Sequence, residues 1–220
     1  MGQSAPSLST ANDKLAYAVG LSVGAQLKAQ GVEPGDAINP QILLAGIIDG
    51  AAGNKPRLSE AEIKTALESH RKAFEAKQEE KLKALKEKNA REARNFLTEN
   101  KKQPGVQALP SGLQYRVIAA GGSSGKSPKA TDTVVVHYKG TLLSGREFDN
   151  SYKRGKSVTF PIKGMIPGWA EALQLMREGA KWQLFIPPQL AYGEAGFGPD
   201  IEPNSLLVFE VELISVKPGS

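Results

Sequence analysis

Apolar residues recur with the period of an α-helix along the first part of the chain. On one face of the stretch that begins near residue 10, the helically spaced positions are Leu15, Ala18, Val19, Ser22, Val23 and Leu27. After a turn rich in glycine and proline at residues 31–35, Asn39 and Pro40 predict a second helix, because asparagine caps helices and proline fits their first position. The pattern over residues 10–53 therefore predicts a helical hairpin.

The second helix of this hairpin is apolar on more than one face. Its large apolar residues are Ile42, Leu43, Leu44, Ile47 and Ile48, and Gly53 marks its end. About 45 residues cannot bury so much apolar surface on their own. We therefore expect residues 1–57 to form a dimerisation domain, in which the hairpin packs against a second copy of itself.

Residues 59–102 predict one long charged helix, the main part of a connecting segment at 58–105. Ser59 and Glu62 have the spacing of a capping box, in which each side chain bonds the other residue's backbone N–H. Apolar positions are sparse, and the apolar seam is too broken for a continuous coiled coil. The favoured interpretation is a solvated spacer held by helix propensity and ion pairs. A surface that binds acidic clients is the alternative.

The pattern changes again from residue 106, where β-branched and aromatic residues alternate with polar ones. Strands are predicted at 113–119, 133–139, 156–161, 180–186 and 205–216, separated by glycine, serine, proline and aspartate. One short amphipathic helix carries Trp169, Ala172, Leu173 and Met176 at helical spacing. Residues 106–220 therefore predict an α+β domain, in which a twisted, mostly antiparallel sheet packs on this helix.

Composition narrows the chemistry. The 220 residues include no cysteine and only two histidines, His70 and His137, so thiolate sites, histidine clusters and cysteine nucleophiles are excluded. The net charge of +5 comes from interspersed acidic and basic residues, unlike the concentrated basic surface of a nucleic-acid-binding protein. No stretch approaches the ~20 apolar residues of a membrane-spanning helix.

No motif for covalent or phosphate chemistry stands out. The glycine-rich stretch at 121–125 lacks the helix and the lysine of a phosphate-binding loop. What remains is a series of aromatic residues beside turns, in the motifs VVVHYKGTLLSGREFDNS, MIPGW, AYGEAGFG and LLVFEVELI. With these motifs in this order, residues 106–216 resemble an FKBP-type peptidyl-prolyl cis-trans isomerase. The helical hairpin and long helix before them resemble the bacterial Mip group of that family, whose members are homodimers.

The resemblance implies a set of site residues. Those implied in catalysis are Phe148, Asp149, Ile166 and Tyr192, and those implied in binding substrate or a macrolide are Tyr138, Arg154, Val158, Met165, Trp169, Ile201 and Phe209. Val158 stands where many relatives have an aromatic pocket wall. The segment 160–164 is also shorter than the corresponding segment in the smallest family members. No metal and no cofactor is implied.

The implied chemistry is non-covalent. Twisting a prolyl amide breaks its resonance over a barrier of ~18–20 kcal/mol and removes charge separation, so an apolar pocket favours the twisted form. Trp169 is expected as the pocket floor, and the Ile166 N–H and the Tyr192 hydroxyl as donors to substrate carbonyls. From pattern alone, Trp169 and Phe209 fit core positions, and Asp149 fits a turn with Asn150 and Ser151. Under the resemblance, Asp149 lies at the pocket edge, where it orients Tyr138 and Arg154 or contacts the ligand.

The expected function is therefore prolyl isomerisation that assists protein folding. Expected partners are proline-containing peptides, unfolded proteins, macrolides of the rapamycin class and a second copy of the chain, without nucleic acid or a membrane span. A client-binding chaperone or a surface-associated, virulence-linked binding protein with incidental isomerase activity is the alternative. The polar N-terminus resembles the start of a mature exported protein after signal removal, which would place the protein in the periplasm or at the outer membrane of a Gram-negative bacterium. An ordinary cytosolic start fits equally well.

Overall fold

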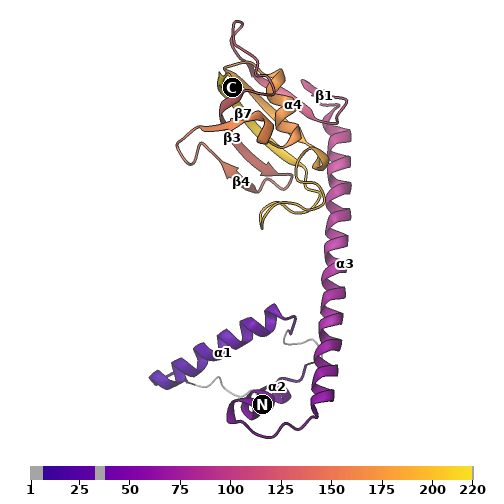
Figure 1. Ribbon diagram of the computed structural model, residues 1–220, viewed down its shortest axis with the longest axis vertical. Coiled ribbons are helices and arrows are strands. Elements are labelled where there is room, and N and C mark those ends of the chain that lie inside the picture. Colours follow the sequence, from indigo (N-terminus) through magenta and orange to yellow (C-terminus); the bar gives the residue numbers. More distant parts are fainter. Residues whose placement is uncertain (1–6, 33–37, 220) are drawn as a thin grey trace. The chain divides into compact units, whose positions relative to one another are not determined.

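The computed structural model describes residues 7–32 and 38–219, which fall into two compact units, Met1–Lys81 and Leu82–Ser220. The beginning of the polar N-terminus and most of the turn at 31–35 lie outside the described residues. Figure 1 shows the helices of the first unit and the sheet of the second. Among the described residues, no helix combines the length and the apolar character that crossing a membrane requires.

The first unit contains α1 (Ala11–Ala29), α2 (Pro40–Ala52) and the start of α3 (Glu60–Asn100), as the hairpin pattern predicted. Each helix begins at a capped residue. The Asn39 side chain accepts a hydrogen bond from the backbone N–H of Gln41. The backbone N–H of Ser59 donates to the Glu62 carboxylate, and the backbone N–H of Glu62 donates to the Ser59 hydroxyl, which confirms the predicted capping box. A second capping box, formed by Thr10 and Asp13, was not predicted.

Neither α1 nor α2 has a buried residue. Large apolar side chains on both helices are exposed, among them Leu15, Val19, Leu21, Ile42, Leu44, Ile47 and Ile48. The turn after α1 approaches α3, where Gly31 lies against the Phe74 ring and the Gln30 carbonyl lies 3.1 Å from the His70 Nε2. These local contacts leave the apolar surface of the hairpin uncovered.

The second unit is built on an antiparallel sheet with the strand order β1-β2-β6-β7-β3-β4, with β5 also paired to β3. The strands are β1 (Val106–Ala108), β2 (Gln114–Ala120), β3 (Thr133–Leu142), β4 (Glu147–Asn150), β5 (Val158–Pro161), β6 (Ala180–Ile186) and β7 (Leu207–Lys217). Helix α4 (Pro167–Leu175) packs on this sheet, flanked by the short 3-10 turns η1 (Ile162–Gly164) and η2 (Pro188–Leu190). The α+β architecture is therefore confirmed.

Strand β3 organises the sheet. It pairs along its whole length with β7, and its other edge is shared by β5 at residues 133–136 and by β4 at residues 139–141. Its alternation sends Val134, Val136 and Tyr138 into the core. Strands β1 and β4 were not predicted, because they are three and four residues long and lack an alternating apolar pattern. Their conformation comes from pairing with a neighbouring strand.

The last turns of α3 pack against the domain instead of standing in solvent. Ala93 is 2% exposed, and the Phe96 and Phe185 ring centroids lie 5.6 Å apart. The Asn100 amide donates to the Gln114 side chain at 2.9 Å. The spacer interpretation therefore does not hold for this end of the helix. The second unit begins at Leu82, within α3, earlier than the boundary at 106 that the sequence predicted.

This packing predicts that the fold of the second unit needs the end of α3. A fragment of residues 82–220 should unfold cooperatively at a clearly higher temperature than a fragment of residues 106–220. The shorter fragment loses the cover of Phe96 over Phe185 and leaves the buried amide of Gln114 without two of its partners, Asn100 and the Leu97 carbonyl. Differential scanning calorimetry of both fragments measures the difference, and equal melting temperatures would contradict it.

Candidate active site

A cavity of about 480 Å³ opens between α4, the β3–β4–β5 edge and the loop that precedes β7. Its walls combine residues of β3, β4, β5, η1, α4 and β7 with residues of the loops before α4 and before β7. The lining residues are Tyr138, Phe148, Asp149, Phe160, Gly164, Met165, Ile166, Trp169, Tyr192, Phe197, Gly198, Pro199, Asp200, Ile201 and Phe209. The chain therefore brings residues that are far apart in sequence to one hollow, and seven of its fifteen lining residues are aromatic.

Trp169 forms the floor, at the first turn of α4. It is 4% exposed and packs edge to face against Tyr138 and Phe209, with ring centroids 5.2 and 5.1 Å away. Its position depends on a close approach of α4 to β6, because a Cβ on Gly168 would meet the Ile186 side chain at 2.4 Å. The indole N–H of Trp169 is buried without a hydrogen-bond partner among the described residues. The floor therefore offers the cavity an apolar face.

The wall opposite α4 uses a second glycine. A Cβ on Gly140 in β3 would lie 2.7 Å from the rings of both Phe148 and Phe209. Without that atom, the two rings meet edge to face at a centroid distance of 5.5 Å. Phe160 from β5 completes this side and packs against Tyr138 and Trp169. Three aromatic rings, those of Tyr138, Phe160 and Phe209, thus pack on the indole, and Phe148 packs on Phe209 behind them.

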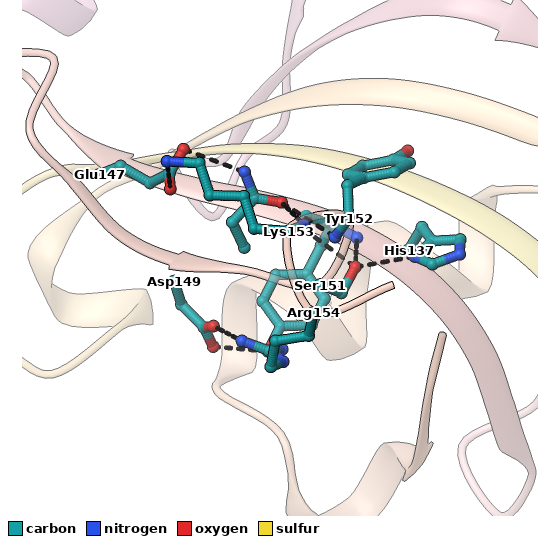
Figure 2. Close-up of polar contacts among 9 residues, drawn as sticks. His137, Glu147, Asp149, Ser151, Tyr152, Lys153 and Arg154 are labelled. Atoms are coloured by element: carbon teal, nitrogen blue, oxygen red, sulfur yellow. Dashed lines mark hydrogen bonds and ion pairs between the residues drawn. The ribbon is translucent and has the colours of Figure 1, made fainter. Parts of the chain in front are cut away.

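One edge of the cavity is polar. The Tyr138 hydroxyl donates to the Asp149 carboxylate at 2.5 Å, and the Arg154 guanidinium is bonded both to that carboxylate and, at 3.0 Å, to the Tyr138 hydroxyl. Figure 2 shows Arg154 folded back so that its guanidinium faces Asp149. The guanidinium also lies 5.6 Å from the centre of the Tyr138 ring. The three side chains form a closed triangle beside the aromatic wall.

The electrostatics of this triangle keep it in one protonation state. Burial raises the pKa of Asp149, but the hydrogen bonds from Tyr138 and Arg154 and the charge of Arg154 outweigh burial and leave that pKa below its ordinary value. Burial and the hydrogen bond to Asp149 raise the pKa of Tyr138. Burial and the charge of Asp149 raise the pKa of Tyr192. Near neutral pH, the carboxylate is therefore ionised and both phenols keep their protons.

The loop that carries Arg154 is anchored by its first residues. The Asn150 side chain accepts hydrogen bonds from the backbone N–H groups of Tyr152 and Lys153. The fully buried Ser151 hydroxyl bonds the backbone of Tyr138 and the His137 ring, and it does so on the side away from Asp149 (Figure 2). The turn-forming role that pattern alone assigned to Asp149 thus belongs to Asn150, and Asp149 is free to face the cavity.

Besides the buried indole N–H of Trp169, two further hydrogen-bond donors at the cavity have no partner within the described part of the chain. The Tyr192 hydroxyl takes part in no hydrogen bond there, although its ring stacks on Phe197 at 4.8 Å. The backbone N–H of Ile166, just before α4, likewise donates to no described group. These donors are therefore available to a bound molecule.

Most of the residues expected from the sequence line this cavity, but Arg154 and Val158 do not. Arg154 reaches the site only through Asp149 and Tyr138. Val158 pairs with Val136, and its short side chain packs on the core without reaching the cavity. The wall expected of Val158 is supplied instead by an aromatic residue, Phe160, two residues later. Because residues two apart in a strand share a face, the alternation of β5 could have indicated Phe160.

The loop before β7 supplies a wall that the sequence analysis found only in part. It places residues 197–201 at the cavity, of which only Ile201 was expected. The two ends of this stretch are joined by backbone hydrogen bonds in both directions between Phe197 and Ile201. Irregular loops have no periodic pattern, so nothing in the spacing of these residues indicated a shared wall.

Within the described residues, no group of three or more histidine, aspartate or glutamate side chains is placed to hold a metal ion.

Comparisons with known proteins agree with this geometry. Residues 124–214 match the family described as FKBP-type peptidyl-prolyl cis-trans isomerase, and residues 12–117 match the domain amino terminal to it. The chain is 44% identical over 216 residues to the outer membrane protein MIP of Legionella longbeachae, which covers 98% of this chain and 90% of that protein. It is also 44% identical over 210 residues to the peptidyl-prolyl cis-trans isomerase Mip of Coxiella burnetii, covering 96% of this chain and 89% of that protein.

A solved structure shows the same architecture. The crystal structure of FkpA from Escherichia coli superposes with a TM-score of 0.79 at 40% sequence identity, and the match covers 97% of this chain and 100% of that chain. The family matches, the relatives and the aromatic cavity lead to one conclusion. The chain belongs to the FKBP-type peptidyl-prolyl cis-trans isomerases, in their Mip group, and it is an enzyme that isomerises prolyl peptide bonds and so assists protein folding.

Proposed function

We propose that the aromatic cavity is the site of isomerisation and that it holds the proline ring of the substrate over Trp169. The observation that carries this proposal is the combination of an aromatic hollow with two donors, the Tyr192 hydroxyl and the Ile166 N–H, that have no partner among the described residues. A proline ring fills the hollow, and the carbonyl groups on either side of it accept from these donors.

The walls lower the barrier without a covalent step. The planar prolyl amide is stabilised by charge separation between oxygen and nitrogen, and twisting the C–N bond removes it. A site lined by Trp169, Phe209 and Phe148 replaces water around the amide by apolar surface, which disfavours the planar form more than the twisted one. The two donors hold the flanking carbonyls in the twisted arrangement, so the binding energy is greatest at the transition state.

Asp149 and Arg154 act differently in this proposal. Asp149 lines the cavity and fixes the Tyr138 ring through its hydroxyl, and Arg154 stands outside and holds the carboxylate. The charge of Asp149 is thereby directed to Arg154 and away from the substrate amide. Arg154 is thus a positioning residue.

We also propose that macrolides of the rapamycin class bind in the same hollow.

We further propose that the protein is a homodimer through its N-terminal hairpin. Ile42 is 71% exposed and Leu15 is 64% exposed within the chain, and further large apolar residues on α1 and α2 are exposed as well. Soluble proteins seldom leave so large an apolar surface uncovered. A second copy carries the same surface and covers it symmetrically.

The proposed location is the cell envelope of a Gram-negative bacterium, in keeping with a relative named as an outer membrane protein.

The proposed donor role of Tyr192 predicts a moderate loss of activity. Tyr192→Phe should lower kcat/KM for a short proline peptide about fivefold, because one hydrogen bond of about 1 kcal/mol is lost in the transition state. Asp149→Leu should cost about tenfold or more, because it leaves the Arg154 charge without its carboxylate and releases Tyr138. Tyr17→Phe removes an exposed hydroxyl on α1 and serves as the control. Isomerase activity unchanged in both site variants would contradict the assignment.

The pKa directions predict a flat pH profile. Because the Asp149 pKa is lowered and those of Tyr138 and Tyr192 are raised, none of these groups changes its protonation state between about pH 6 and pH 9. The stabilising contribution of the Asp149 carboxylate is present above its unfolded-state pKa of about 4 and is lost only as the pH falls through its lowered folded-state pKa. We expect constant kcat/KM over that range at constant ionic strength. A rise or fall of kcat/KM with pH near neutrality would contradict this prediction, because it would show that a group titrating in that range takes part in catalysis.

The exposed hairpin predicts a dimer in solution. Multi-angle light scattering at micromolar concentration should give twice the chain mass for the full protein and one chain mass for residues 82–220. Ile42→Glu should shift the full protein toward the monomer, because it places a charge in the apolar contact. Gln41→Glu adds the same charge at a neighbouring polar position and serves as the control. A monomeric full-length protein would refute the dimer proposal.

A further inference from the structure

The cavity wall formed by residues 197–201 is irregular, and its position depends on how the loop is held. Within the loop, the bonds between Phe197 and Ile201 close a small ring, and the Asn204 N–H donates to the Gly193 carbonyl at 2.8 Å. At the β3–β4 turn, the Arg146 guanidinium bonds Asp200. None of these contacts joins the loop to a regular strand ladder. The loop therefore needs a further support to keep its place.

Helix α3 provides that support from outside the cavity. The Asn89 side-chain amide donates to the Pro203 carbonyl at 2.9 Å and also lies 3.3 Å from the Glu202 carboxylate. One turn earlier on the same face of the helix, the Lys86 carbonyl accepts from the Asn204 side chain at 3.2 Å, and the Lys86 ammonium pairs with Glu194 at 3.4 Å. These bonds fix the loop on both sides of the segment that lines the cavity, and all of them lie within the unit that begins at Leu82.

The backbone of Asn204 shows that the contact is built into the loop. Its φ of 56° is the one positive value at a non-glycine residue in the described part of the chain. Asparagine tolerates this left-handed conformation better than most residues, but glycine would adopt it at no steric cost. The asparagine differs from glycine here in its side-chain amide, which donates a hydrogen bond to the Lys86 carbonyl on α3.

We propose that Asn89 and Asn204 are positioning residues for the isomerase site, and that the end of α3 sets the substrate affinity through them. No residue of α3 lines the cavity, so the helix acts only through the loop. When the loop is released, only a fraction of the molecules hold residues 197–201 in the arrangement that binds substrate. The apparent affinity for substrate is then the intrinsic affinity multiplied by that fraction. Once substrate is bound, the wall is held by the substrate as well. The effect therefore falls on KM more than on kcat.

The test uses the full-length protein with two informative variants. Asn89→Asp keeps the size of the side chain but replaces its donor by a carboxylate that faces the Pro203 carbonyl and Glu202. Asn204→Gly keeps the left-handed backbone and removes the bond to Lys86. Each should raise KM for a short proline peptide about three- to tenfold with kcat changed less than twofold, which corresponds to the loss of a single hydrogen bond.

Amide hydrogen exchange, measured by NMR, provides a readout that does not depend on catalysis. The N–H groups of Phe197 and Ile201 should exchange several-fold faster in both variants, and those of β6 should keep their wild-type rates. Asn95→Ala is the matched control, because Asn95 is an exposed asparagine on the same helix whose side chain forms no hydrogen bond or ion pair with any described residue. It should leave KM and both sets of exchange rates unchanged.

The outcomes separate this inference from the proposed function of the cavity, on which it rests. Unchanged KM and unchanged loop exchange in Asn89→Asp and Asn204→Gly would overturn the inference alone. Faster exchange in β6 as well as in the loop would show general destabilisation and would also overturn it. If the loop is released but KM stays the same, and Tyr192→Phe also retains full activity, the cavity is not the isomerase site and both proposals fail.

Discussion

The edge-to-face packing of Trp169 with Tyr138 and Phe209 is the interaction on which the site depends. These three residues belong to the hydrophobic core of the domain and also line the cavity. A core that is closed on every side could not bind a ligand, and a cleft with polar walls would not exclude water from the amide. Here the core itself opens on one side, so the walls of the cavity are as rigid as the packed interior.

Charge is kept at the margin of this apolar surface. A carboxylate inside such a hollow would be costly unless it were paired and hydrogen-bonded. Asp149 meets both conditions, because Tyr138 and Arg154 occupy its oxygens. Arg154 in turn comes from a short loop fixed by Asn150 and by the buried Ser151 (Figure 2). The ionised pair therefore orders the aromatic wall while the space above Trp169 stays apolar.

The sequence predicted the regular parts of the molecule well because their patterns have a physical period. Both hairpin helices, the cap formed by Ser59 and Glu62, the helix that carries Trp169 and five of the strands follow from such periods and caps. Strand β4 has no apolar alternation of its own, and its place follows from pairing with β3. The site residues came from motif resemblance, since Trp169 and Phe209 look like core residues by pattern. That reading is also correct, because both are buried.

The long helix shows why average patterns mislead. Over its whole length, its apolar residues are too sparse to predict packing. Yet Ala93, Phe96, Leu97 and Asn100 have the spacing i, i+3, i+4 and i+7, which is one helix face over two turns. This short stripe meets the sheet, and the same face continues back to Asn89 and Lys86 at the loop.

Helix α3 is therefore stabilised in different ways along its length. From Lys86 to its end, tertiary contacts hold it, and nearer its start, an exposed ion pair such as Arg71 with Glu75 adds only about 0.5 kcal/mol. Long exposed helices of charged residues are held mainly by propensity and length. Anchoring one end removes the fraying that would otherwise begin there. The contacts that order the loop at the cavity thus also stabilise the helix, and neither can be loosened without affecting the other.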